Sequence, residues 1–372
     1  MKWGKKLEEY ILCVPGPVDL TPRVYQALGR KMIPHYGEDW INGVYNPVCN
    51  MVKNVFQTKH RSFVLPASGS GGIESAFCSL GKKDEEALIF SNGYFGDRMA
   101  RIAKMYFKCV HIYKLKMGEA ITDEHIEKAL KLHSNASVIG IVHGETSTGV
   151  KNEIQHIRSM AGERILVVDA ISTLAGDEIK MDEWGIDICV SASQKAIGAP
   201  PGLALVSVSD HAFRKMQQRD KIPSFYLNLL EWRDSVLEWG ETHPYPVTLP
   251  VNLYYALYVA LQEIHEEGLD KRIVRHNQIA EYTHKRIMEL GLELLLKDKN
   301  RTMSTVTAVR MPEGKNASDL ISRLKKENKI LIANGQGELK NRIFRIGHLS
   351  VSANTETIEL VTDKIGSILK SI

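Results

Sequence analysis

The chain contains little cysteine: five residues in 372, none paired in a C-x-x-C spacing. An odd, scattered set argues against a disulfide framework and against a zinc site, and it is typical of a reducing compartment. We therefore expect a cytoplasmic protein without a structural metal. The five positions are Cys13, Cys49, Cys78, Cys109 and Cys189.

The sequence also lacks a long apolar run and an excess of one charge. No segment approaches the roughly 20 apolar residues that a membrane helix needs. Residues 1–6 lead into acidic residues and not into the apolar core of a signal peptide. The net charge is only +4, with both signs scattered along the chain. We therefore expect neither a membrane nor a nucleic acid as partner.

The composition that is present is that of an ordinary globular protein, with 44% hydrophobic and 25% charged residues. A chain of 372 residues is long enough for two domains. We predict a large domain over residues 1–265, which includes the N-terminal segment, and a small C-terminal domain over residues 266–372.

From about residue 60 to residue 210, short apolar and β-branched runs alternate with segments of helical spacing. This alternation predicts an α/β fold with a mainly parallel, doubly wound sheet. Such sheets bind ligands at the carboxyl ends of their strands. The predicted strands are 87–90, 110–115, 138–143, 165–169, 188–193 and 203–209, and the predicted helices are 71–80, 93–106, 123–132 and 153–160.

Beyond residue 220 the pattern changes. Residues 221–250 are rich in Pro, Tyr and Trp and predict irregular structure, whereas residues 251–290 predict one long helix. The rest of the chain predicts an α+β unit of about a hundred residues. Its predicted strands are 306–310, 330–332 and 343–346, and its predicted helices are 317–328 and 355–372.

Two charged residues follow or end predicted strands. Lys195 is either an ordinary solvated lysine or a desolvated amine whose lowered pKa lets it attack an aldehyde. Asp169 ends an apolar run at the same edge of the sheet. It is either a helix cap or an anion that keeps the ring nitrogen of a cofactor protonated, so that the ring can accept electrons.

Two further features suit an anionic ligand. Residues 68–72, Ser-Gly-Ser-Gly-Gly, precede a predicted helix. They form either an ordinary turn or a phosphate cradle of backbone N–H groups, and they match neither a P-loop nor a full dinucleotide fingerprint. Arg345 lies near the end of an apolar strand. It forms either a surface salt bridge or a two-pronged clamp on a substrate carboxylate.

Together these residues resemble the class V aminotransferases of pyridoxal 5'-phosphate (PLP) fold type I, and most of all the alanine–glyoxylate and serine–pyruvate aminotransferase group. The likeness runs over nearly the whole chain, with the motifs in the same order and at similar spacing. The motifs are Pro-Gly-Pro at 15–17, the loop 68–74, Asn-Gly-Tyr-Phe-Gly at 92–96, His-Gly-Glu-Thr-Ser-Thr-Gly at 143–149, Val-Asp at 168–169, Ser-Gln-Lys-Ala at 193–196 with Pro-Pro-Gly at 200–202, and Arg-Ile-Gly at 345–347.

The resemblance implies PLP as cofactor, Lys195 as the Schiff-base lysine and general base, and Asp169 as the partner of the ring nitrogen. It also implies a homodimer with shared active sites. The other implied residues are Ser70, Gly71, Gly72 and Gln194 at the phosphate, Phe95 stacked on the ring, Thr146 beside it, Arg345 and Gly16 at the substrate, and Tyr245 and Thr248 at the phosphate of the other subunit.

Two positions depart from the family pattern. Gly72 stands where relatives carry a larger residue, often His or Thr, and Phe95 replaces a Trp, which leaves a smaller stacking surface. Both departures bear on the choice of substrate.

The implied activity moves an amino group from a small L-amino acid, alanine or serine, to a 2-oxo acid such as glyoxylate or pyruvate. Two alternatives stay open: an aminotransferase for substrates of the 2-aminoethylphosphonate type, and a non-catalytic PLP-binding protein. A desulfurase of the same fold agrees less well, because the ring position is Phe95 and not a histidine, and no cysteine follows Cys189.

Overall fold

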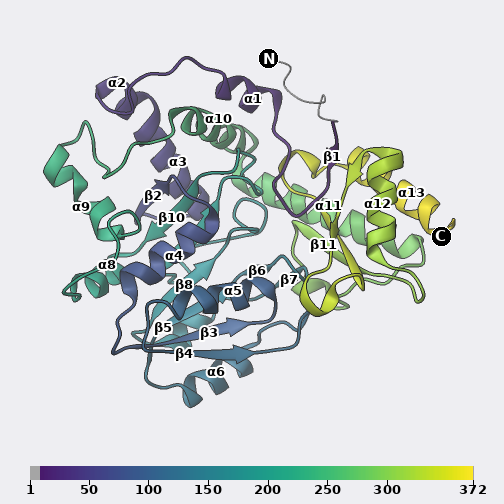
Figure 1. Ribbon diagram of the computed structural model, residues 1–372, viewed down its shortest axis with the longest axis horizontal. Helices are drawn as coiled ribbons and strands as arrows, with labels where there is room; N and C mark the ends of the chain where they lie inside the picture. Colours follow the sequence, from purple (N-terminus) through teal and green to yellow (C-terminus); the bar gives the residue numbers. More distant parts are fainter. Residues whose placement is uncertain (1–8, 372) are drawn as a thin grey trace, which may run out of the picture.

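The computed structural model describes residues 9–371, and its centre is a seven-stranded sheet (Figure 1). The strand order is β2–β10–β9–β8–β5–β3–β4; six strands run parallel, and β10 is antiparallel to both of its neighbours. The predicted α/β fold with a mainly parallel sheet is confirmed. The strands are β2 Arg61–Leu65, β3 Glu86–Ser91, β4 Cys109–Lys114, β5 Ala136–Val142, β8 Ile165–Asp169, β9 Ile188–Ala192 and β10 Ala204–Val208.

Two helices bring their first turns to the carboxyl edge of this sheet. Helix α4 (Gly69–Leu80) follows β2 and packs against β9 and β10, and helix α5 (Tyr94–Ala103) follows β3 and packs against β3 and β5. Because β2 and β3 run in the same direction, both helices begin at the same edge. The two helices also contact each other, so their N-termini lie close together where β8 ends.

The chain returns from β9 to β10 through residues 193–203 at this same edge. A parallel neighbour would need a crossover of roughly a dozen residues or more. The shorter connection leaves β10 antiparallel, and it holds Lys195 at the carboxyl end of β9.

The prediction of irregular structure over residues 221–250 is wrong in part, because helix α9 spans Leu229–Trp239. The Asn228 side chain accepts a hydrogen bond from the N–H of Leu230 (3.0 Å) and so caps the helix. Trp232 is buried on the helix, and its indole N–H donates to the carbonyl of Tyr226 (2.8 Å). The aromatic residues that suggested a loop therefore include part of the packed face of a helix.

The single long helix expected over residues 251–290 is two helices, α10 (Val251–Glu267) and α11 (Leu269–Glu289). Gly268 separates them with φ of +85°, a conformation that favours glycine. The chain therefore turns here. The remaining helices of this part are α1 Pro22–Leu28, α2 Glu38–Trp40, α3 Asn46–Phe56, α6 Asp123–Leu132, α7 Ile157–Ala161 and α8 Asp210–Gln217.

The C-terminal part contains a three-stranded antiparallel sheet, in the order β11–β14–β13, with a hydrophobic cluster of its own. Strand β12, which was expected as part of this unit, pairs in parallel with the N-terminal strand β1. The domain boundary at residue 265 stays a prediction. The elements are β1 Ile11–Leu12, β11 Val306–Arg310, α12 Ala317–Asn328, β12 Ile330–Leu331, β13 Ala333–Asn334, β14 Ile343–Gly347 and α13 Thr355–Leu369.

Helix α13 ends at Leu369, and the predicted end at residue 372 lies outside the described residues. Among the helices of residues 9–371, none is both long enough and apolar enough to span a membrane.

Candidate functional site

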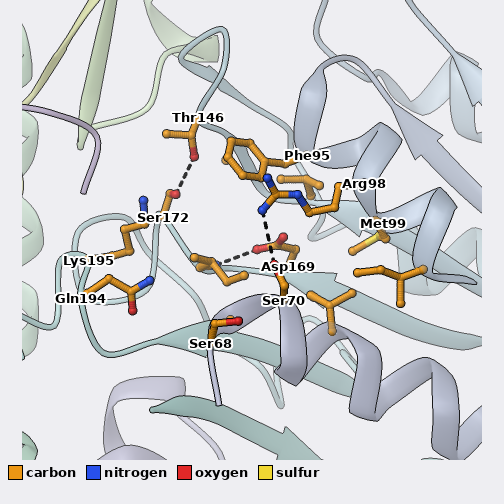
Figure 2. A pocket seen from close by; sticks show the side chains of 16 residues that line it. Ser68, Ser70, Phe95, Arg98, Met99, Thr146, Asp169, Ser172, Gln194 and Lys195 are labelled. Atoms are coloured by element: carbon orange, nitrogen blue, oxygen red, sulfur yellow. Dashed lines mark hydrogen bonds between the residues drawn. The ribbon is translucent and has the colours of Figure 1, made fainter. Parts of the chain in front are cut away.

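A cavity of about 390 Å³ opens at the carboxyl edge of the large sheet. Its wall comes from the end of β8, the first turns of α4 and α5, the 193–203 connection, and the hairpin of β6 (Gly144–Glu145) and β7 (Val150–Lys151) (Figure 2). The cavity brings together six of the predicted site residues. They are Ser70, Phe95, Thr146, Asp169, Gln194 and Lys195.

Lys195 brings a partly neutral amine to this cavity. Burial lowers the pKa of Lys195 to about 8; the negative charge of Asp169 opposes this shift, and the positive charges of Arg345 and Arg98 add to it. The amine donates a hydrogen bond to the carbonyl of Pro15. An amine with such a pKa can serve as a nucleophile and as a base near neutral pH.

Gly16 packs directly against the Lys195 side chain, whereas its place at the substrate stays a prediction. A Cβ atom built on Gly16 would lie 2.7 Å from the Lys195 amine nitrogen. The φ of Gly16 is also +94°, which a residue with a side chain rarely adopts. The position therefore demands glycine, and the backbone comes close to the amine.

Asp169 is a buried carboxylate, and its burial disfavours the ionised form. It ends β8 in register with Val142 of β5 and Val190 of β9, and it is 7% exposed. Burial raises the pKa of Asp169 to about 7, although the N–H of Ile171 donates to its Oδ1 (2.8 Å). The ionised form is thus disfavoured by about 4 kcal/mol. A cation roughly 4 Å away contributes about 4 kcal/mol at an effective dielectric constant near 20, which offsets this cost.

The first turn of α4 is open to the cavity. Ser68, Gly69 and Ser70 line the wall, and the side chain of Ser68, the residue before the helix, makes no capping hydrogen bond. The first amides of a helix have no partner within the helix and attract anions. This turn is therefore open to an anion, and its contact with a cofactor phosphate stays a prediction.

Helix α4 begins at Gly69, two residues earlier than predicted, and Gly72 does not line the cavity. The Gly72 N–H donates to the carbonyl of Ser68 within the helix (3.1 Å), and a Cβ there would lie 2.7 Å from Val190. Gly71 does not line the cavity either, and a Cβ there would meet Ala67. The small size of Gly72 thus serves the packing of α4 on the sheet, and the roles of Gly71 and Gly72 at the phosphate stay predictions.

Three other predicted residues complete the wall. Phe95 projects from the first turn of α5 and forms its aromatic part. Thr146 Oγ1 shares a hydrogen bond with Ser172 Oγ (2.5 Å). Gln194 has a buried Oε1 without a hydrogen-bond partner in the described part of the chain, so its amide is available to a ligand.

Arg345 lies outside the lining of this cavity but is held rigidly. It is 5% exposed; its Nε and Nη2 donate to the carbonyl of Asn334 (3.0 and 2.7 Å), and its Nη1 donates to the carbonyl of Thr146 (3.0 Å). Burial lowers its pKa to about 10, an effect that the negative charge of Glu145 opposes. Arg345 remains a cation at neutral pH, and its charge reaches Lys195.

Tyr245 and Thr248 do not line the cavity of their own chain. Tyr245 is fully buried 4.8 Å from the ring centroid of Tyr45, and its hydroxyl donates to the carbonyl of His35. Thr248 is exposed. Their contribution to the other subunit's site stays a prediction.

Arg98 places a cation in the cavity that was not predicted from the sequence. The Arg98 guanidinium lies 4.9 Å from the ring centroid of Phe95, and its Nη1 is 3.3 Å from Ser70 Oγ (Figure 2). Residues three apart on a helix are neighbours, so the spacing from Phe95 could have identified Arg98. No comparable signal marks Ser172, because serines are common in turns after strands.

The cavity fits PLP group by group. The open turn of α4 suits a phosphate, and the Lys195 amine suits an aldehyde. The buried Asp169 carboxylate suits a protonated ring nitrogen, and Phe95 suits an aromatic ring. Fold and cavity together define a PLP-dependent enzyme of fold type I.

The chain belongs to the class V aminotransferases. The family model described as "Aminotransferase class-V" matches residues 23–342. The protein is therefore a PLP-dependent transaminase, an enzyme with amino acids and 2-oxo acids as substrates.

Individual proteins support this placement. The chain is 33% identical to alanine–glyoxylate aminotransferase of Mus musculus over 364 residues, which cover 97% of this chain and 87% of that protein. It is similar to the structure of ureidoglycine–glyoxylate aminotransferase of Bacillus subtilis (28% identity, TM-score 0.91, coverage 100% and 95%). It is also similar to the structure of pyridoxamine–pyruvate aminotransferase of Mesorhizobium loti (26% identity, TM-score 0.93, coverage 100% and 94%).

The pKa of Lys195 predicts how the cofactor-free protein captures PLP. With a pKa of about 8, about a tenth of the amine is neutral at pH 7 and about nine tenths at pH 9. The rate of capture, measured by stopped-flow absorbance, should therefore rise about tenfold between these values and then level off. A rate that still rises as steeply above pH 9, or equal capture by a Lys195→Ala variant, would contradict this assignment.

Proposed function

We propose that this enzyme transfers an amino group from a small L-amino acid, alanine or serine, to glyoxylate or pyruvate. The observation that carries the proposal is Arg345, a buried cation fixed by three hydrogen bonds to backbone carbonyls within electrostatic reach of Lys195. Such a group suits the carboxylate that amino acids and 2-oxo acids share. The names of the three similar proteins differ in the amino donor but share glyoxylate or pyruvate.

The residues divide the chemistry among them. When bound, PLP supplies an aldehyde that takes up the amino group and a ring that accepts electrons. Lys195 would hold the cofactor through its amine, and the same amine would move the α-proton of the substrate. Asp169 keeps the ring nitrogen protonated, and Arg345 orients the substrate carboxylate. Release of one 2-oxo acid and uptake of a second would complete the transfer of the amino group.

Replacing Arg345 with lysine keeps the charge but removes the planar pair of donors. We expect the KM for L-alanine and L-serine to rise roughly ten- to a hundredfold, the effect of losing a hydrogen bond to a charged group. Conversion of the PLP form to the pyridoxamine form, followed by absorbance, gives this KM. Ethylamine, which lacks the carboxylate, serves as control and should react equally poorly with both proteins.

The same assay can overturn the proposal. Wild-type enzyme that binds ethylamine as tightly as L-alanine would contradict the carboxylate clamp. Faster reaction with 2-aminoethylphosphonate than with alanine or serine would favour the phosphonate alternative.

We also propose that the enzyme is a homodimer in which each subunit contributes Tyr245 and Thr248 to the cofactor phosphate of the other. Neither residue lines the cavity of its own chain. Large apolar side chains are exposed on the segments before them: Phe225 is 61% exposed, Leu237 83% and Trp239 56%. Exposed apolar side chains of this size are typical of an interface, and twofold dimers are the commonest symmetric assembly.

Mixing two inactive variants tests the shared site. One is Lys195→Ala, and the other is Tyr245→Phe/Thr248→Ala, which keeps the buried ring. After subunit exchange, a mixed dimer contains one site with Lys195 and an intact partner segment, so activity should return. Mixed dimers that form but stay inactive would place both hydroxyls away from the partner's site. Each variant alone serves as control.

We propose a cytoplasmic location, because the cysteines form no disulfide. All five are free, and Cys13, Cys78 and Cys189 are buried. Free thiols throughout a chain of this size are typical of a reducing compartment.

A further inference from the structure

Glu145, which has no assigned role, is a buried carboxylate between Gly144 and Thr146, two residues that line the cavity. It is fully buried, and no salt bridge to it forms within residues 9–371. Its partners are instead N–H and O–H donors. Oε2 accepts from the N–H groups of Phe95 and Gly96 (3.0 Å each), and Oε1 accepts from the N–H (3.1 Å) and Oγ (2.5 Å) of Ser147.

These hydrogen bonds close the N-terminus of α5. Gly93, the residue before the helix, has no side chain to cap it. A Cβ on Gly93 would lie 2.4 Å from Cγ of Glu145, so the carboxylate occupies the space beside the helix end. The N–H of Tyr94 is taken in turn by Ser147 Oγ (3.1 Å). Three first-turn amides of α5 are thus satisfied by side chains of another segment.

The contrast with α4 shows what this arrangement achieves. Both helices begin at the same edge of the sheet, and either N-terminus could attract an anion. The first turn of α4 is left without a side-chain cap, whereas that of α5 is filled by Glu145. An anionic ligand is therefore directed to α4, and Phe95 is held at a fixed place on α5.

The same loop holds the cation of the proposed substrate clamp. Thr146 follows Glu145, and its carbonyl accepts the hydrogen bond from Arg345 Nη1 (3.0 Å). Its hydroxyl bonds to Ser172 on the segment after Asp169. Burial lowers the pKa of Arg345, and the negative charge of Glu145 partly offsets this shift. Glu145 is thus hydrogen-bonded to the backbone of Phe95, and the next residue, Thr146, is hydrogen-bonded to Arg345.

We propose that Glu145 is a positioning residue that fixes Phe95 and the Thr146–Arg345 contact relative to each other, so that cofactor ring and substrate carboxylate are held in one geometry. This inference rests on the proposed roles of Phe95 and Arg345. Only a carboxylate can accept from all four donors at once. A side-chain amide of the same shape would turn its NH₂ group toward two of them.

The test is Glu145→Gln. Leaving buried donors unpaired should weaken PLP binding roughly tenfold and raise the KM for L-alanine roughly tenfold. It should also reduce the visible circular dichroism of bound PLP, because the ring is held less rigidly. If Glu145 acts through Arg345, the KM effects of Glu145→Gln and Arg345→Lys combine to less than their product.

Thr122→Ala is the matched control. Thr122 caps α6 by accepting from the N–H of His125 (3.4 Å), and α6 supplies no residue to the cavity. This variant should lower thermal stability and leave PLP affinity, circular dichroism and KM unchanged. If Glu145→Gln behaves in the same way, the positioning role is overturned.

Three other variants keep the result interpretable. If Glu145→Gln does not fold, Ser147→Ala removes one donor to Oε1 and the cap on Tyr94, and should shift the same quantities in the same direction by about two- to fivefold; no shift would overturn the proposal. Phe95→Ala and Arg345→Lys test the assignments beneath it. If neither alters PLP affinity or KM, the proposed function fails. If both alter these quantities and Glu145→Gln does not, only the role of Glu145 fails.

Discussion

The site depends on a carboxylate placed where water cannot solvate it. Asp169 stands at the carboxyl end of a central strand, between β5 and β9, and its pKa is raised to about 7 by burial. A protein gains nothing from such a charge unless a cation joins it. We propose that a protonated pyridine nitrogen of the cofactor supplies that cation, and that the stabilisation of this nitrogen makes the ring an electron acceptor. In this proposal, the ion pair that offsets the cost of burying Asp169 is the same interaction that activates the cofactor ring.

The other groups follow from this placement. Parallel strands bring the end of β8 and the starts of α4 and α5 to one edge, and the short return to β10 adds Lys195. Burial makes the Lys195 amine partly neutral. The positive charge that balances Asp169 must therefore come from another group. One helix start is left open and the other is filled by Glu145. On the proposed assignments, these elements hold the cofactor phosphate, the cofactor ring and the substrate in separate places.

Strand ends could be predicted from the sequence because continuous apolar runs with a polar last residue identify them. That was sufficient for Asp169, Lys195 and the parallel sheet. The start of helix α4 was predicted two residues too late, because a run of Ser and Gly does not reveal which amide begins the helix. Helix α9 was missed because its aromatic residues resemble a loop until their packing is known. The contacts of Glu145 join segments 50 residues apart, and local patterns carry no information on such pairs.

The most direct test of this account is the rate of α-proton exchange of L-alanine in D₂O with a PLP-bound Asp169→Asn variant. An amide cannot stabilise the pyridinium by charge, so the account predicts bound cofactor but exchange slowed by roughly a thousandfold, the equivalent of about 4 kcal/mol. Exchange at nearly the wild-type rate, with PLP bound, would show that the buried charge is not what drives the reaction.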